Sequence, residues 1–277
     1  MHRLSNAYKR GQLTLVLGAG CSLSSLNHEG QNLPSGEGLS ELLCERFGIQ
    51  RDGEPLSEVV EGILEDVSRE VVDNYITDLM KVSVPSRDYE RLASAFFRRI
   101  YTLNIDDGLE RAFYKNATAN KIRIFQRYDS PRPPKVLFDE TQIIKLNGCV
   151  SRPDNGYIFS LSDYYSGHAD LPAWYSELAT NCFSETVVFI GTQLEEPLLF
   201  DAIKRAGKYN ENLKSFLILP KISDTRKKVL RRLGVEWIEG TLADFLDHLE
   251  ADDCFSMGNR QIAVNREPSL DVILNQS

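Results

Sequence analysis

The sequence contains no apolar run that approaches the roughly 20 residues needed to cross a bilayer. Its first residues, MHRLSNAYKRGQ, are basic but have no apolar core, so we expect no secretory signal. An excess of positive charge is missing too, because the formal net charge is −8. Direct nucleic-acid binding is therefore not expected. These absences predict a cytoplasmic protein with neither a membrane nor a nucleic acid as its partner.

Paired cysteines are also absent. The five cysteines, at positions 21, 44, 149, 182 and 254, form no C-x-x-C motif, which argues against a structural zinc ribbon. We expect reduced thiols and no metal site. The sequence has no internal repeat and no low-complexity run, and its 277 residues suffice for one large α/β domain or for a core domain with an inserted lobe.

Apolar runs typical of strands alternate with helical patterns along most of the chain. The first run lies in QLTLVLGAGCS, and others follow at 98–104, 141–147, 185–191, 214–220 and 234–239. This alternation predicts an α/β fold with a Rossmann-like, doubly wound parallel sheet. Residues 55–98 are helical in pattern and predict an inserted helical lobe, whereas 115–140 is predicted to be a loop. We expect one domain over 1–250, followed by a linker or the start of a further domain at 251–277.

Polar or glycine-rich motifs follow several of the predicted strands. Gly18 and Gly20 in VLGAGCS come where the first strand is expected to meet a helix, the usual place for a pyrophosphate. The third glycine of a strict dinucleotide fingerprint is missing, because position 23 is Leu23. A tight turn without a ligand would explain the two glycines equally well. The apolar strand directly before them favours binding.

Three more motifs lie at the ends of strands. In YTLNIDDGLE, Asn104 ends a strand and two aspartates, Asp106 among them, open a helix. Helix capping accounts for one aspartate but not for the asparagine as well. KLNG places Asn147 after the next strand, and VVFIGTQLEEP places Gly191 and Thr192 at another glycine turn. In a parallel sheet, the carboxyl ends of the strands are where ligands bind.

VLGAGCS, TLNID, KLNG and VFIGTQLEEP together resemble the successive motifs of sirtuin-like (Sir2-like) domains of bacterial antiphage defence proteins, over about residues 8–250. The resemblance implies NAD as ligand or substrate, and an NAD+ hydrolase that releases nicotinamide. Deacylase sirtuins carry a four-cysteine zinc module that this chain lacks, so the resemblance is to the hydrolase branch. It implies that Gly18, Ala19, Gly20 and Ser22 hold the pyrophosphate. The same resemblance places Asn104 at the ribose and the attacking water, Asp106 at the nicotinamide amide, and Gly191 and Thr192 along the adenosine half.

Asn147 stands where this family has its catalytic histidine. Histidine can accept a proton near neutral pH, whereas an asparagine amide cannot, although it copies part of the shape and hydrogen bonding of the imidazole. Three interpretations stay open: an enzyme whose water is placed mainly by Asn104, a sensor that binds NAD or ADP-ribose without cleaving it, or an engineered substitution. His168, the histidine nearest this motif in sequence, is expected on the surface because its neighbours are polar and turn-forming.

The leading hypothesis is therefore an NAD-hydrolysing effector domain that depletes NAD in antiphage defence, and the alternative is a catalytically inactive NAD-binding or ADP-ribose-binding sensor. A hydride-transferring dehydrogenase is disfavoured, because it leaves NID and KLNG unexplained. A constitutive NAD hydrolase would harm its host. We therefore expect a homo-oligomer or further domains of a larger protein, and a phage-derived or partner-protein trigger. The lobe at 55–98 is the expected contact surface.

Overall fold

A computed structural model describes residues 1–116, 121–131, 140–169, 173–209 and 215–255. Its centre is a seven-stranded sheet in the order β5-β6-β4-β1-β7-β8-β9, in which every neighbouring pair is parallel. The strands are β1 Leu13–Leu17, β4 Arg99–Thr102, β5 Lys121–Gln126, β6 Glu140–Lys145, β7 Thr186–Ile190, β8 Ser215–Leu219 and β9 Val235–Glu239. Without β5, the strand order is that of a dinucleotide-binding sheet: successive strands are added on one side of β1 and then on the other. The predicted Rossmann-like, doubly wound fold is confirmed.

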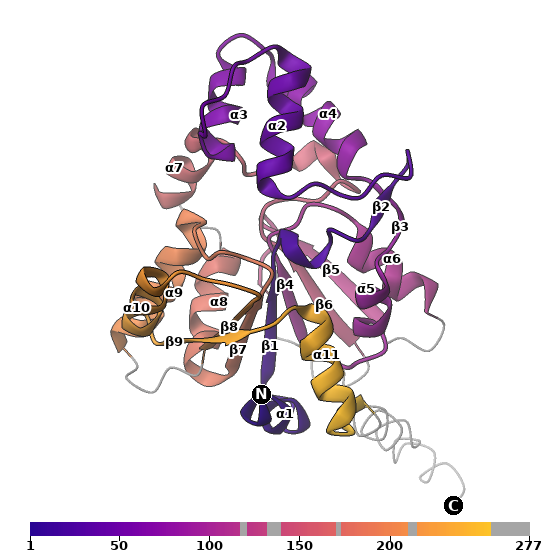
Figure 1. Ribbon diagram of the computed structural model, residues 1–277, viewed down its shortest axis with the longest axis vertical. Helices are drawn as coiled ribbons and strands as arrows, with labels where there is room; N and C mark the ends of the chain where they lie inside the picture. The colour runs from indigo at the N-terminus through magenta and orange to yellow at the C-terminus, as the bar shows by residue number, and fades with distance from the viewer. Residues whose placement is uncertain (117–120, 132–139, 170–172, 210–214, 256–277) are drawn as a thin grey trace, which may run out of the picture.

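Helices cover both faces of this sheet (Figure 1). They are α1 His2–Lys9, α2 Gly36–Phe47, α3 Leu56–Leu64, α4 Arg69–Met80, α5 Arg87–Leu92, α6 Gly108–Lys115, α7 Leu161–Ala169, α8 Ala173–Ser184, α9 Pro197–Tyr209, α10 Asp224–Arg232 and α11 Leu242–Ala251. Two 3-10 helices, Ala19–Cys21 and Pro153–Asn155, and a two-stranded antiparallel sheet of β2 Leu26–Asn27 and β3 Val82–Val84 complete the described elements.

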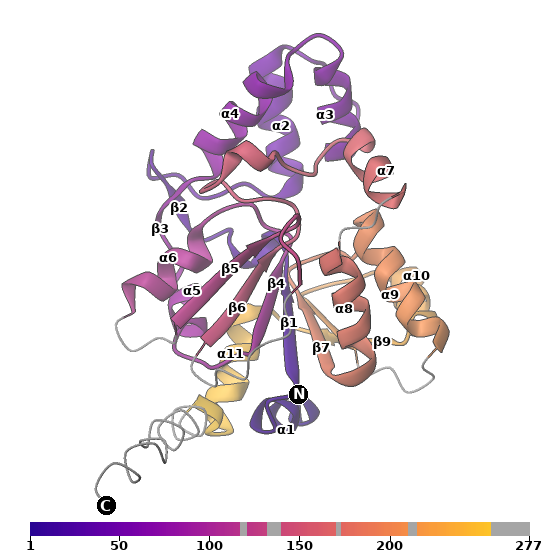
Figure 2. The same ribbon diagram turned by 180° about the vertical axis from the view of Figure 1, so that it is seen from behind.

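Both faces of the sheet are buried at its centre, which explains why β1, β7 and β8 read as continuous apolar runs. Alternate residues of β1 point to opposite faces, so Leu15 and Leu17 lie in one apolar core and Val16 in the other. Helices α1, α5, α6 and α11 complete the first core, and α8, α9 and α10 complete the second. Figure 2 shows the second group from behind, with α8 directly against the sheet.

Helices α2, α3 and α4 form a separate lobe beyond the carboxyl ends of the strands (Figure 1). The apolar faces of the three helices meet in a third core, which also includes Ile105, Val150 and Tyr157 from the segments that follow β4 and β6. The lobe therefore rests on the edge of the sheet where the polar motifs were predicted. Helix α5, by contrast, packs into the core of the main sheet through Tyr89 and Leu92.

Three local predictions were wrong. Residues 115–140 were predicted to be a loop, but 121–126 form the edge strand β5, because the alternating sequence KIRIFQ suits a strand with one exposed face and pairs with β6 along its length. The helical segment 55–98 also contains β3, which pairs with β2. After β1 the chain forms only the three-residue 3-10 helix, and the next α-helix begins at Gly36.

Two other predictions fall outside what the structure describes. These are the side chain of His168 and the tail from residue 256 onward. None of the described helices is long and apolar enough to cross a membrane.

Candidate functional site at the carboxyl edge of the sheet

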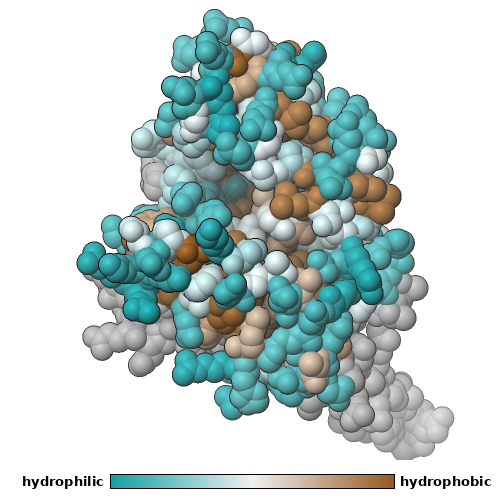
Figure 3. All heavy atoms as spheres, viewed as in Figure 1, coloured by the Kyte–Doolittle hydropathy of each residue, from teal (hydrophilic) through white to brown (hydrophobic). Residues whose placement is uncertain are grey.

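The strand registers align the polar motifs along one edge of the sheet. Ile190 of β7, Leu17 of β1, Thr102 of β4 and Lys145 of β6 occupy one row of paired residues. Two positions beyond that row stand Thr192, Ala19, Asn104 and Asn147. Because neighbouring strands lie about 4.8 Å apart, motifs that are far apart in sequence meet here. Figure 3 shows the surface hollowed between this edge and the helical lobe.

The glycine turn after β1 packs directly on the glycine turn after β7. The N–H of Gly18 donates to the carbonyl oxygen of Ile190, and that of Gly20 to the carbonyl of Gly191, each at 2.9 Å. A Cβ on Gly18 would lie 2.6 Å from the Gly191 oxygen, and Gly191 itself has a φ of +68°. Glycine is required here for close packing of two backbones, and these two N–H groups are already satisfied within the protein.

Asn104 ties the end of β4 to this turn. Its Nδ2 lies 3.0 Å from the carbonyl oxygen of Gly18, 3.3 Å from Oγ of Ser22 and 3.2 Å from the hydroxyl of Tyr89. Tyr89 comes from α5 and is fully buried. The amide nitrogen is thus held by protein groups, and the orientation of the side chain is set from three sides.

The two aspartates after Asn104 have different surroundings. Asp107 is engaged by the protein on both oxygens: Oδ1 accepts from the N–H of Val82, and Oδ2 accepts from Nε of Arg111 at 2.7 Å. Asp106 accepts from the N–H of Gly108 at 3.0 Å through Oδ1, but its buried Oδ2 has no hydrogen-bond partner among the described residues. Capping and tertiary contacts thus account for both carboxylate oxygens of Asp107 and for Oδ1 of Asp106. They do not account for the burial of Oδ2 of Asp106.

Burial raises the pKa of Asp106 to about 6, although the nearby Lys145 ammonium acts in the opposite direction. Lys145, on β6, is itself 1 % exposed and pairs with Glu110 at 3.0 Å. Its Nζ also donates to the carbonyl oxygen of Asp106. Burial alone would lower the pKa of Lys145, but Glu110, Cys149 and Asp106 together outweigh that effect and the pKa is raised. A charged pair thus lies directly beneath the site.

Asn147 lies in a second polar cluster on the other side of the same edge. The hydroxyl of Tyr175, on α8, is 2.9 Å from Oδ1 of Asn147 and 2.6 Å from Oε1 of Glu196. Oε2 of Glu196 is closed off from solvent and has no partner among the described residues. Burial raises the pKa of Glu196 to about 7, while the hydrogen bond from Tyr175 and the nearby amide of Asn147 lower it.

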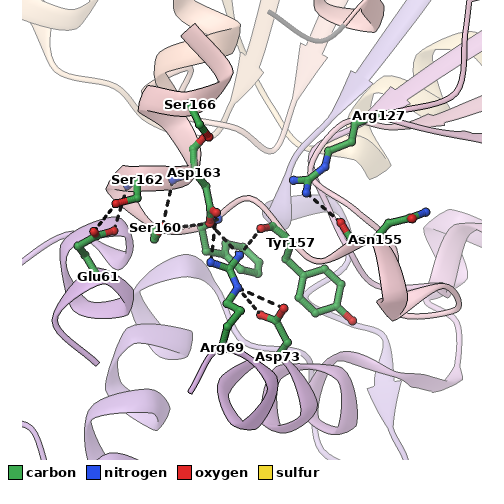
Figure 4. Close-up of polar contacts among 11 residues, drawn as sticks. Glu61, Arg69, Asp73, Arg127, Asn155, Tyr157, Ser160, Ser162, Asp163 and Ser166 are labelled. Atoms are coloured by element: carbon green, nitrogen blue, oxygen red, sulfur yellow. Dashed lines mark hydrogen bonds and ion pairs between the residues drawn. The ribbon is translucent and has the colours of Figure 1, made fainter. Parts of the chain in front are cut away.

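An ionic clasp joins the helical lobe to α7 beside the site (Figure 4). Arg69 of α4 donates to both oxygens of Asp163 on α7, at 3.1 and 2.9 Å, and to the carbonyl oxygen of Tyr157 at 2.5 Å. It also pairs with Asp73 one turn along its own helix. In the same interface, Glu61 of α3 accepts from the N–H of Ser162 at 3.0 Å. The clasp spans 94 residues of sequence.

The structure brings most of the predicted site residues together. Ser22, Asn104 and Asp106 form one group, because Nδ2 of Asn104 donates to Oγ of Ser22 and the nearby Ser22 hydroxyl lowers the pKa of Asp106. Gly18, Gly20 and Gly191 form the adjoining backbone contact. The side chain of Thr192 forms a hydrogen bond within its own turn, since its Oγ1 accepts from the N–H of Leu194 at 3.1 Å. No hydrogen bond among the described residues links Asn147 to Asn104; the side-chain partner of Asn147 is Tyr175 on α8, which also contacts Glu196 beside α9.

Sequence reasoning missed Tyr89, Tyr175 and Glu196. Glu196 lies within the quoted motif GTQLEEP, so its position could have been noticed, but nothing distinguishes it from Glu195. The two tyrosines sit in ordinary helical patterns that give no sign of a role at the strand ends.

A doubly wound sheet with glycine turns and buried polar side chains at one carboxyl edge defines the class of nucleotide-binding α/β proteins. The model of the SIR2-like domain family matches residues 98–238. This chain belongs to that family, so the predicted resemblance to Sir2-like domains is confirmed, and with it an NAD-related function. No curated protein matches the sequence.

Among the described residues, no group of three or more His, Cys, Asp or Glu side chains is placed to hold a metal ion. All five cysteines are buried free thiols.

Proposed function

We propose that the carboxyl edge of the sheet binds NAD and hydrolyses its nicotinamide–ribose bond. The observation that carries the proposal is the unpartnered, buried Oδ2 of Asp106 beside Asn104. A buried polar atom without a partner is costly, and the N–H donors of the nicotinamide carboxamide would satisfy it. Membership of the SIR2-like family supports NAD as the ligand.

In this proposal Asn104 orients the ligand. Its nitrogen is held by Gly18, Ser22 and Tyr89, so its Oδ1 is the end of the amide that can accept from a ribose hydroxyl or from the attacking water. The turn formed by Gly18, Ala19, Gly20 and Ser22 would face the pyrophosphate. Gly191 and Thr192 would lie along the adenosine half. A fixed water and a fixed ribose lower the barrier by removing the cost of bringing them together.

The test is to incubate the full chain with NAD and to follow free nicotinamide by chromatography. Release of nicotinamide and ADP-ribose in equal amounts supports hydrolysis. The Asn147→His variant should be assayed in parallel, because it restores a group that can accept a proton near neutral pH. Absence of nicotinamide release from both proteins would contradict the proposed reaction.

A second candidate is a sensor that binds NAD or ADP-ribose and does not cleave it. The neutral amide of Asn147 favours this candidate, because losing a general base typically costs about 10²–10⁴ in rate. Calorimetry separates the two: NAD binding without turnover supports the sensor, and no binding of NAD or ADP-ribose excludes both.

We place the activity in antiphage defence on the resemblance in motif order alone, with NAD depletion as the effect. Because unrestrained hydrolysis would harm the host, the chain should be nearly silent by itself and gain activity in an oligomer or on contact with a phage or partner protein. Light scattering combined with NAD turnover per site, with and without phage lysate, checks this. A fast monomer that is indifferent to lysate would contradict it.

A further inference from the structure

The cluster of Asn147, Tyr175 and Glu196 contains more acceptor oxygens than one phenol proton can serve. Tyr175 has a single hydroxyl proton, yet its oxygen is 2.9 Å from Oδ1 of Asn147 and 2.6 Å from Oε1 of Glu196. If Tyr175 donates to Asn147, its short contact with Glu196 needs a proton on the carboxyl group. If Glu196 is ionised, Tyr175 donates to it instead, and the Asn147 amide turns over so that its Nδ2 donates to the phenol oxygen. The geometry therefore accommodates Glu196 in both protonation states.

Glu196 is also the carboxyl group that Tyr175 joins to Asn147, the position that lacks histidine. It directly precedes α9, and Tyr175 reaches it from α8. The other titratable or charged groups that act on this pair are Tyr164 on α7, whose pKa Glu196 helps to raise, and Arg127 after β5, which favours the ionised form of Tyr175. Asp163 acts in turn on Tyr164.

We infer that Glu196 is the proton acceptor of this site, with Oε1 held by Tyr175 and Oε2 accepting from the water that attacks the ribose. This inference rests on the proposed hydrolysis. The bond between C1′ and the nicotinamide nitrogen breaks, and its electron pair neutralises the charge on the pyridinium ring. The water oxygen bonds to C1′, and the water proton passes to Oε2 of Glu196 and then to solvent. NAD+ and water thus give nicotinamide, ADP-ribose and one proton.

Two features fit this role. The unpartnered Oε2 leaves one lone pair for a water or a ribose hydroxyl, and one buried oxygen without a partner calls for an explanation. A base works best when its pKa lies near the working pH, and the pKa of about 7 meets that condition. Asn147 then keeps a hydrogen-bonding role, and the carboxylate supplies the basicity that the amide lacks.

The experiment measures nicotinamide release by the full chain from about pH 5 to about pH 9, together with NAD affinity by calorimetry. Unchanged protein should gain about tenfold in rate per pH unit below an inflection near the pKa of Glu196, and then level off. Glu196→Gln should lose about 10²–10⁴ in kcat and lose the inflection, while NAD affinity stays within about threefold. Glu195→Gln, at the exposed neighbour, should match the unchanged protein.

Tyr175→Phe provides a second readout that does not depend on the folding of Glu196→Gln. Removing the hydroxyl removes a hydrogen bond that lowers the pKa of Glu196, so the inflection should move to higher pH. Full activity and an unchanged inflection in Glu196→Gln, or an inflection that does not move in Tyr175→Phe, would overturn Glu196 as the base and leave the hydrolysis intact. Absence of nicotinamide release from unchanged protein at every pH would overturn both.

Discussion

The side chain of Asn104 donates to the carbonyl oxygen of Gly18 across 3.0 Å and so joins the end of β4 to the glycine turn after β1. The two residues are 86 positions apart in sequence. This contact makes Asn104 both a structural tie and a candidate ligand-binding group, and a variant has to be assayed for both effects.

Replacing Asn104 with alanine should abolish nicotinamide release and leave the fold intact. The Gly18 carbonyl and the Tyr89 hydroxyl lose a donor, so the free energy of unfolding should fall by about 1–3 kcal/mol. Nicotinamide assays and urea titration measure the two effects, and Asn6→Ala, on the exposed face of α1, is the matched control. Undiminished release would remove Asn104 from the site.

Gly18→Ala should destabilise the protein by about 1–3 kcal/mol, because the new methyl group would lie 2.6 Å from the Gly191 oxygen and separate two packed turns. Gly62→Ala is the contrasting control. It lies within α3 with nothing near its would-be Cβ, so alanine there should stabilise by about 0.5–1 kcal/mol. Thermal unfolding of both variants tests the pair, and equal shifts would refute the packing argument.

NAD affinity should rise with pH through about 6, where Asp106 ionises in the folded protein. The direction follows because the carboxylate accepts hydrogen bonds from a carboxamide better than the neutral acid does. Asp106→Asn should weaken binding at neutral pH and remove this dependence, whereas Asp78→Asn, exposed on α4, should change neither. Calorimetric titrations at several pH values provide the check, and a flat profile in the unchanged protein would count against Asp106 as a ligand-binding group.

Lys145→Met should destabilise the fold by about 3–5 kcal/mol, because Glu110 would be left buried without its cation. Adding Glu110→Leu should recover most of that loss, since the uncompensated charge is then gone as well. Lys204→Met, at an exposed position on α9, serves as the control in the same urea titrations. A double variant no more stable than Lys145→Met alone would show that the pair does not act as a unit.

Arg69→Ala should loosen α7 from the helical lobe, because one guanidinium holds Asp163, Asp73 and the Tyr157 carbonyl together. We expect amide hydrogens around Asp163 to exchange at least about tenfold faster, since each charge-assisted bond contributes about 1.5–3 kcal/mol. Hydrogen exchange followed by mass spectrometry measures this. Arg232→Ala, at an exposed position of α10, should leave α7 unchanged. Equal exchange in both variants would mean that the clasp does not hold α7.

The sequence by itself determined the strands and their polar ends. Strands buried on both faces are mainly apolar, so β1, β7 and β8 are visible as runs. The apolar residues of β4, β6 and β9 are visible between polar ones, and the polar motifs that follow the strands are visible as interruptions. That is why Asn104, Asp106, Asn147 and Gly191 could be placed at one edge before the fold was known. The edge strand β5 was missed because its short alternating pattern, KIRIFQ, stands beside the charged and proline-rich RYDSPRPP, and pairing with β6 orders it.

Only the tertiary structure decided which side chains meet at that edge. Tyr175 reaches Asn147 across 28 residues and Glu196 across 21, and Arg69 reaches Asp163 across 94. No local pattern encodes these contacts, because they depend on how α8, α9 and the lobe cross the strands. The unpartnered oxygens of Asp106 and Glu196, two of several among the described residues, likewise exist only once burial has excluded water from one side of each carboxyl group.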